Sequence, residues 1–152
     1  MAQFIPTPPN NFTPITRSGG CICGAHRYAY TGAPVEELEV LSCNCGMCTD
    51  KGSLNLYLKP EGLTWTKGSW DTLKQYKWYA DYYEKHIICH FCETCGTFFG
   101  GAGPGYVMLN ARTFDRVDTA ELKIKPFNAR GRTAKMDAED AARKEPAVAV
   151  GV

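Results

Sequence analysis

The cysteines constrain this chain more than any other feature of its sequence. The 152-residue chain has eight of them in three groups: Cys21 and Cys23; Cys43, Cys45 and Cys48; and Cys89, Cys92 and Cys95. Zinc binds thiolates in a tetrahedron, and a short C-x-C or C-x-x-C turn can direct two sulfur atoms at one ion. The layout of the cysteines therefore indicates metal sites.

Disulfides are the alternative, because eight cysteines could form four bridges. Thiols two or three positions apart are more typical of metal-binding turns. The first nine residues, MAQFIPTPP, have neither the basic start nor the apolar segment of a signal peptide, so we expect no leader or membrane anchor. We therefore expect reduced thiols and a cytoplasmic location, in the cytosol or the nucleus.

Charge gives no indication of a polyanionic partner. The chain has 17 basic and 16 acidic residues, and this near balance argues against binding to nucleic acid or to an anionic membrane surface. No apolar run approaches the length that crosses a bilayer. We expect neither nucleic acid nor a membrane as a partner, and the sequence leaves the oligomeric state open.

Short runs with alternating apolar residues, separated by glycine and proline, predict an all-β fold. In the stretch SLNLYL, for example, Leu54, Leu56 and Leu58 would share one face of a strand. Strands are expected at residues 25–31, 38–42, 53–58, 63–66, 73–78, 84–91 and 106–111. We assign residues 1–16 to an irregular Pro-rich arm, 17–131 to one zinc-binding domain, and 132–152 to a weakly packed tail.

Four further local expectations concern the segments between strands. The dense cysteine triplet is expected to form a turn at a strand end, and residues 100–105, GGAGPG, a loop. Residues 114–122 are expected to form a turn and a short helix. Gly24 and Gly96 follow cysteine turns, where positive φ angles are needed.

A closed zinc site needs four ligands, and the simplest partition of the thiols joins the first pair to the last. Cys21, Cys23, Cys92 and Cys95 would then hold a structural zinc that ties the start of the domain to its end. Cys43, Cys45 and Cys48 would hold a second ion with three protein ligands. An open fourth position is what a catalytic zinc site keeps.

Cys89 leaves this partition open. In a regular strand its side chain points away from the face used by a residue three positions later, so it should not share the Cys92 site. It could be a buried free thiol, which behaves as a small hydrophobic residue. It could also be the fourth ligand of the triplet, which would close the second site.

At this level of detail the chain resembles the glutathione-dependent formaldehyde-activating enzyme family, which also contains centromere protein V. The resemblance rests on the stretches GGCICG at 19–24, SCNCGMC at 42–48, FCETCGT at 91–97 and LNAR at 109–112, and covers roughly residues 17–131. It implies zinc-stapled antiparallel sheets, with a structural zinc on the first and last cysteine pairs. It also implies a second zinc on the triplet, with a position open to a substrate thiol.

The activity that the resemblance implies is that of a carbon–sulfur lyase acting on a glutathione adduct such as S-hydroxymethylglutathione. Glutathione would then be the substrate or co-substrate, with two zinc ions per chain. Two alternatives are a non-catalytic zinc-stabilised binding module, and an enzyme of the same fold that acts on another small molecule. Thiolate sites without a redox partner favour zinc over iron.

Other side chains are candidates for handling the substrate. His26, His86 and His90 could transfer a proton, although histidines in strands are commonly structural. Asn44 and Thr49 flank the triplet and could hydrogen-bond its sulfurs or a substrate, or could support the backbone. Arg27 and Arg112 could each bind a substrate carboxylate or form a structural ion pair.

Overall fold

The computed structural model describes residues 11–80 and 85–131. The predicted tail at 132–152 and most of the predicted arm at 1–16 lie outside these residues. The described part consists mainly of β-strands in two sheets, and all but one of the strand pairs are antiparallel. The expected all-β fold is confirmed.

The smaller sheet has three strands in the order β1-β2-β5. Their bounds are β1 Ile15–Gly20, β2 Arg27–Gly32 and β5 Leu63–Lys67. The larger sheet has seven strands in the order β10-β3-β4-β9-β8-β7-β6. Their bounds are β3 Glu39–Cys43, β4 Asn55–Leu58, β6 Lys74–Ala80, β7 Lys85–Phe91, β8 Phe98–Gly103, β9 Tyr106–Asn110 and β10 Lys123–Phe127.

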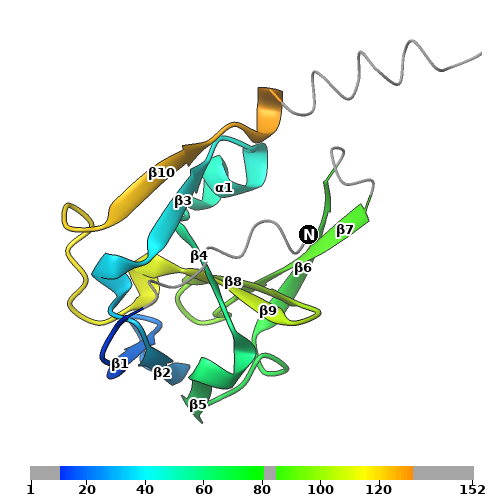
Figure 1. Ribbon diagram of the computed structural model, residues 1–152. Coiled ribbons are helices and arrows are strands. Elements are labelled where there is room, and N and C mark those ends of the chain that lie inside the picture. The colour runs from blue at the N-terminus through cyan, green and yellow to red at the C-terminus, as the bar shows by residue number, and fades with distance from the viewer. Residues whose placement is uncertain (1–10, 81–84, 132–152) are drawn as a thin grey trace, which may run out of the picture.

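Helical structure is limited to short segments between the strands. The α-helix α1 spans Gly46–Lys51, and three 3₁₀ turns are η2 Val35–Glu37, η3 Pro60–Gly62 and η5 Ala111–Thr113. Figure 1 shows α1 beside β3 and β10, on the opposite side of the molecule from β1, β2 and β5. No helix among the described residues is long and apolar enough to cross a membrane.

The period-two patterns correctly predict several strands of the core, whereas β1, β8 and β10 were not among the expected strands. Tyr28 and Tyr30 of β2 are both buried, as are Leu56 and Leu58 of β4. They belong to the larger of two apolar clusters, in which Tyr28 meets Phe114 edge to face at a centroid distance of 5.4 Å. The strand expected at residues 73–78 is observed as β6.

Three local expectations were wrong. The triplet does not form a simple turn, because Cys48 lies in helix α1. Residues 100–103 belong to strand β8, where a β-carbon added to Gly100 would lie 2.0 Å from the carbonyl oxygen of Met108. This close approach explains a glycine inside a strand. Residues 114–122 form turns without a helix.

Candidate metal centres and the adjoining pocket

The first metal-binding candidate lies where the two sheets meet. Cys21 and Cys23 lie in the turn between β1 and β2, whereas Cys92 and Cys95 lie between β7 and β8 of the larger sheet. The four Sγ atoms all lie within 4.8 Å of one another. These residues, which we call the inter-sheet cluster, therefore bring the two sheets together at one point.

Both turns of the inter-sheet cluster include a glycine of positive φ whose amide donates to the carbonyl of a cysteine. The amide of Gly24 donates to the carbonyl of Cys21 at 3.0 Å, and that of Gly96 donates to Cys92 at 2.8 Å. Gly24 and Gly96 have φ angles of 73° and 72°, so the prediction that both adopt positive φ is confirmed. Each glycine thus lets the chain turn back around the sulfur atoms.

The sulfur spacing of the inter-sheet cluster suits a single metal ion. The Sγ atom of Cys23 lies 3.4 Å from that of Cys21 and 3.6 Å from that of Cys92. A tetrahedral site with Zn–S bonds of about 2.3 Å separates its sulfurs by about 3.8 Å. Thr97 hydrogen-bonds Cys95 at 3.2 Å, and this contact lowers the pKa of the Cys95 thiol to about 6. The donor set fits zinc.

The second candidate, which we call the triplet, brings Cys43, Cys45 and Cys48 together with Sγ atoms within 4.8 Å of one another. Cys43 ends β3, Cys45 is the N-cap of α1, and Cys48 follows in the first turn of the helix. The amide of Cys48 donates to the Cys45 sulfur at 3.5 Å, and that of Cys45 to the Cys43 sulfur at 3.4 Å. Helix α1 thus positions the thiols.

Crowding of the three thiols favours a cation among them. The hydrogen-bonded neighbours Cys45 and Cys48 raise the pKa of Cys43, because its thiolate would form beside other sulfur groups. A bound divalent cation stabilises thiolates strongly enough to reverse this effect. The triplet therefore also fits a metal ion, with three protein ligands where the inter-sheet cluster has four.

Cys89 is buried beside the triplet without joining it. It packs in the smaller apolar cluster with Cys45 and Cys48, but its sulfur is not among those grouped within 4.8 Å. Burial raises the pKa of the Cys89 thiol to about 11, with a further contribution from the nearby Cys48. Its position outside that group leaves the triplet with three sulfur ligands.

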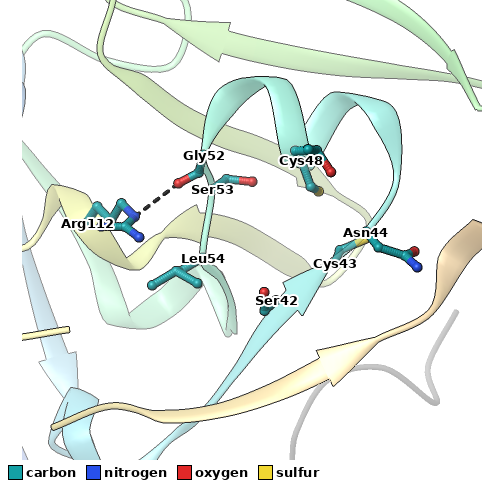
Figure 2. Close-up of a pocket in the computed structure, with 9 residues that line it drawn as sticks. Ser42, Cys43, Asn44, Cys48, Gly52, Ser53, Leu54 and Arg112 are labelled. Carbon is teal, nitrogen blue, oxygen red and sulfur yellow. Dashed lines mark hydrogen bonds between the residues drawn. The ribbon is translucent and has the colours of Figure 1, made fainter. Parts of the chain in front are cut away.

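A pocket of about 340 Å³ opens beside the triplet. Its walls come from the end of β3, the middle of helix α1, the segment between α1 and β4, and the η5 turn. Its lining residues are Ser42, Cys43, Asn44, Cys48, Thr49, Gly52, Ser53, Leu54 and Arg112. Figure 2 shows Arg112 reaching Gly52, whose carbonyl oxygen accepts a hydrogen bond from Nε at 3.0 Å. Two sulfur ligands thus face the same space as a guanidinium group.

The two arginine candidates are placed differently. Arg27 forms an ion pair with Asp115, which raises the pKa of Arg27. Arg112 pairs with no carboxylate among residues 11–80 and 85–131, and it is exposed at the pocket. The structure therefore gives Arg27 a structural partner and leaves the terminal nitrogens of Arg112 in position to meet an anion.

The flanking polar residues and the histidines have other contacts. The side chain of Asn44 lines the pocket but bonds Asn128 at 2.8 Å and accepts from the amide of Arg130 at 3.0 Å. His26 lies by Thr72, with 3.2 Å between Nε2 and the hydroxyl oxygen, and His90 packs against Trp70. None of the three histidines lines the pocket.

Sequence reasoning missed two polar residues next to the triplet, Ser53 and Asn55. Ser53 lines the pocket, and the amide Nδ2 of Asn55 donates to Cys48 Sγ at 3.1 Å. Both are buried and alternate with the core residues Leu54 and Leu56. Polar side chains on the second face of an otherwise apolar strand were the available signal.

Replacing Asn55 by leucine should weaken metal binding at the triplet about 10- to 100-fold, as is typical for loss of a hydrogen bond to a ligand atom. The Asn55 amide stabilises the thiolate form of Cys48 in particular. Competition with a chromophoric chelator would measure the two affinities separately. The inter-sheet cluster is the internal control, since Asn55 makes no contact there, and an equal loss at both sites would contradict the assignment.

Comparison with known proteins identifies a protein of similar fold and the family of this chain. No curated protein matches the chain. The crystal structure of a Rhodobacter sphaeroides protein matches it with a TM-score of 0.56 and 21% sequence identity, covering 72% of this chain and 97% of that one. This likeness shows a shared fold. A profile of the glutathione-dependent formaldehyde-activating enzymes matches residues 16–130, so the chain belongs to the glutathione-dependent formaldehyde-activating enzyme family.

Proposed function

We propose that the protein is a zinc-dependent carbon–sulfur lyase acting on the adduct of a thiol, best glutathione, with a small aldehyde, such as S-hydroxymethylglutathione. One observation carries the proposal: two members of a three-sulfur cluster line a pocket together with an arginine that has no carboxylate partner in the described chain. Three protein ligands are the number that catalytic zinc sites use. Family membership supports the choice of glutathione.

The two clusters would have different tasks. In the inter-sheet cluster Cys92 is fully buried and the four sulfurs would complete the coordination of one ion, so an ion held there would be structural. In the triplet Cys43, Cys45 and Cys48 would hold the second zinc. When bound there, zinc would stabilise a substrate sulfur as thiolate, which favours both attack on an aldehyde and departure from an adduct.

The residues around the triplet would orient the substrate. The Nε of Arg112 is fixed by the Gly52 carbonyl, so its terminal nitrogens can form a charge-assisted hydrogen-bonded pair with a carboxylate of glutathione. A cavity of about 340 Å³ falls at the small end of ligand pockets, which suits an open site that holds the thiol end of a tripeptide. The substrate's sulfur would then face Cys43 and Cys48.

The reaction would take place in a reducing compartment, and we propose the cytosol. None of the eight cysteines, all of which lie in the described residues, forms a disulfide, and several must be available as thiolates for metal binding.

Exchange between formaldehyde, glutathione and their adduct, followed by NMR exchange spectroscopy, tests the proposal. Catalytic amounts of zinc-loaded protein should accelerate exchange well above the uncatalysed rate. The Cys45→Ser variant, described in the Discussion, is the matched protein control. Exchange at the uncatalysed rate with a fully zinc-loaded, folded protein would contradict the proposed activity.

Replacing Arg112 by glutamine should raise KM for glutathione adducts by about tenfold with a smaller change in kcat. A single hydrogen-bonded pair to a charged group contributes roughly 1.5–3 kcal/mol, and this contact would be made equally to substrate and transition state. Steady-state kinetics would measure the change. Arg116→Gln is the control, because Arg116 is exposed and lies outside the pocket. An unchanged KM in Arg112→Gln would remove Arg112 from the binding site.

A further inference from the structure

Ser53 is the one pocket residue whose buried hydroxyl has no partner in the described structure. Its relative exposure is 5%, and its Oγ makes no hydrogen bond with residues 11–80 or 85–131. Other buried hydroxyl groups are satisfied: Thr113 donates to the Asn110 carbonyl at 2.7 Å, and Tyr28 bonds Thr113 at 2.8 Å. An unpaired buried hydroxyl costs free energy, so the position of Ser53 requires a physical reason.

The backbone fixes Ser53 between the triplet and the arginine. Gly52 ends helix α1 in the left-handed conformation, with φ of 57°, and the amide of Ser53 then donates to the carbonyl of Cys48 at 3.0 Å. The adjacent Gly52 carbonyl holds Arg112. Figure 2 shows Ser53 directly after the helix, next to the Gly52–Arg112 contact. The segment Gly52–Ser53 thus contacts both Cys48 and Arg112 and carries the Ser53 hydroxyl group between them.

The pocket lining contains no histidine and no carboxylate. His26 and His90, the buried histidines, bond Thr72 and pack against Trp70, respectively. None of the three histidines that the sequence offers as candidates for proton transfer is therefore in this lining. Among the uncharged polar groups there, Ser53 is the one that is both buried and unpaired.

We propose that Ser53 Oγ–H donates a hydrogen bond to the oxygen of the substrate's hydroxymethyl group. This inference rests on the proposed function and adds a residue at the reacting atoms. In adduct cleavage the hydroxyl proton passes to water, and the oxygen's electron pair forms the C=O bond. The C–S bond breaks, and its electron pair remains on sulfur. Ser53 stabilises the negative charge on oxygen before that bond breaks, as an oxyanion-hole donor does.

The same contact selects adducts that have a hydroxyl group on the carbon bound to sulfur. A site that hydrogen-bonds a substrate hydroxyl discriminates against an analogue without it, because the site's own buried polar group is then left unpaired. Ser53 would favour aldehyde adducts over simple thioethers of the same thiol.

Calorimetric binding of S-hydroxymethylglutathione, kept at equilibrium by excess formaldehyde, and of its hydroxyl-free counterpart S-ethylglutathione tests this inference. The two compounds have similar size and differ in one hydroxyl group. The wild-type protein should prefer the hydroxymethyl compound by about tenfold, the size of one net hydrogen bond. Ser53→Ala should bind both compounds about equally. Ser42→Ala is the matched control, since Ser42 lines the same pocket without being fully buried, and it should keep the wild-type preference.

The outcomes separate this inference from the proposed function. If the wild-type protein binds both compounds without preference, or if Ser53→Ala keeps the preference, the role of Ser53 is wrong while thiol binding stands. If neither compound nor glutathione binds the zinc-loaded wild-type protein, both proposals are wrong. A second readout is the exchange rate, which should fall about a hundredfold in Ser53→Ala, as for loss of one oxyanion donor.

Discussion

Replacement of Cys92 by serine is expected to leave the chain unfolded at ordinary temperature. Cys92 is fully buried in the larger apolar cluster and belongs to the cluster that joins the two sheets. Binding of a structural zinc contributes about 10–16 kcal/mol in small zinc-binding peptides, which is comparable with the whole stability of a domain, about 5–15 kcal/mol. Loss of one ligand from such a site should therefore remove most of the stability.

Circular dichroism and thermal unfolding would measure this effect. Wild-type protein treated with a strong chelator should show the same loss of cooperative unfolding. Cys89→Ala is the matched control: it removes an equally buried thiol that lies outside both sulfur clusters, and it should fold. A cooperative transition close to that of the wild type in Cys92→Ser would show that the inter-sheet cluster does not hold the fold together.

Replacement of Cys45 by serine should remove most turnover while the protein stays folded. Cys45 is the N-cap of α1, and serine is among the preferred N-cap residues, so the helix can keep its first turn. The triplet would lose one of three sulfur ligands, and the second zinc with it. Because the inter-sheet cluster is untouched, the midpoint of thermal unfolding should change little.

The control for Cys45→Ser is Cys89→Ser, which alters a buried thiol in the same apolar cluster but not in the triplet. Adduct exchange by NMR should be close to the uncatalysed rate in the first variant and close to the wild-type rate in the second. Full activity in Cys45→Ser would contradict a catalytic triplet. Loss of activity in both variants would give Cys89 a role that its position outside the sulfur group does not predict.

The positions of the cysteines and most strands could be predicted because they depend on local pattern. Strand alternation placed Tyr28 and Tyr30 in the core, and C-x-C and C-x-x-C spacings grouped the thiols as the structure groups them. Helix α1 was missed because six residues that begin with Gly46 carry no helical periodicity. The helix is instead determined by its ends: the Cys45 side chain caps its start, and Gly52 ends it in the left-handed conformation.

What could not be predicted depends on contacts between distant segments. The pocket joins residues 42–54 with Arg112, and β10 pairs in parallel with β3 although 80 residues separate Lys123 from Cys43. No local pattern encodes that pairing. Gly100 was assigned to a loop because the sequence does not show the Met108 carbonyl that excludes any side chain there.

No histidine lines the pocket, although the sequence offers three as candidates for proton transfer. His26 and His90 are both buried, and burial lowers the pKa of His90, which disfavours its charged form. Both pack among aromatic rings of the core, with His90 5.0 Å from Trp70 between ring centroids. These positions are typical of structural histidines. The buried polar residues next to the triplet are instead Ser53 and Asn55.

Metal content per chain is the most direct measure of whether the inter-sheet cluster and the triplet both bind zinc. Protein purified without added metal or chelator is analysed for elements, in the wild type and in Cys45→Ser. If both sulfur clusters bind zinc, the wild-type chain should contain two zinc ions and the variant one. One zinc in both proteins would leave the inter-sheet cluster as the metal site and contradict a zinc-dependent reaction at the triplet.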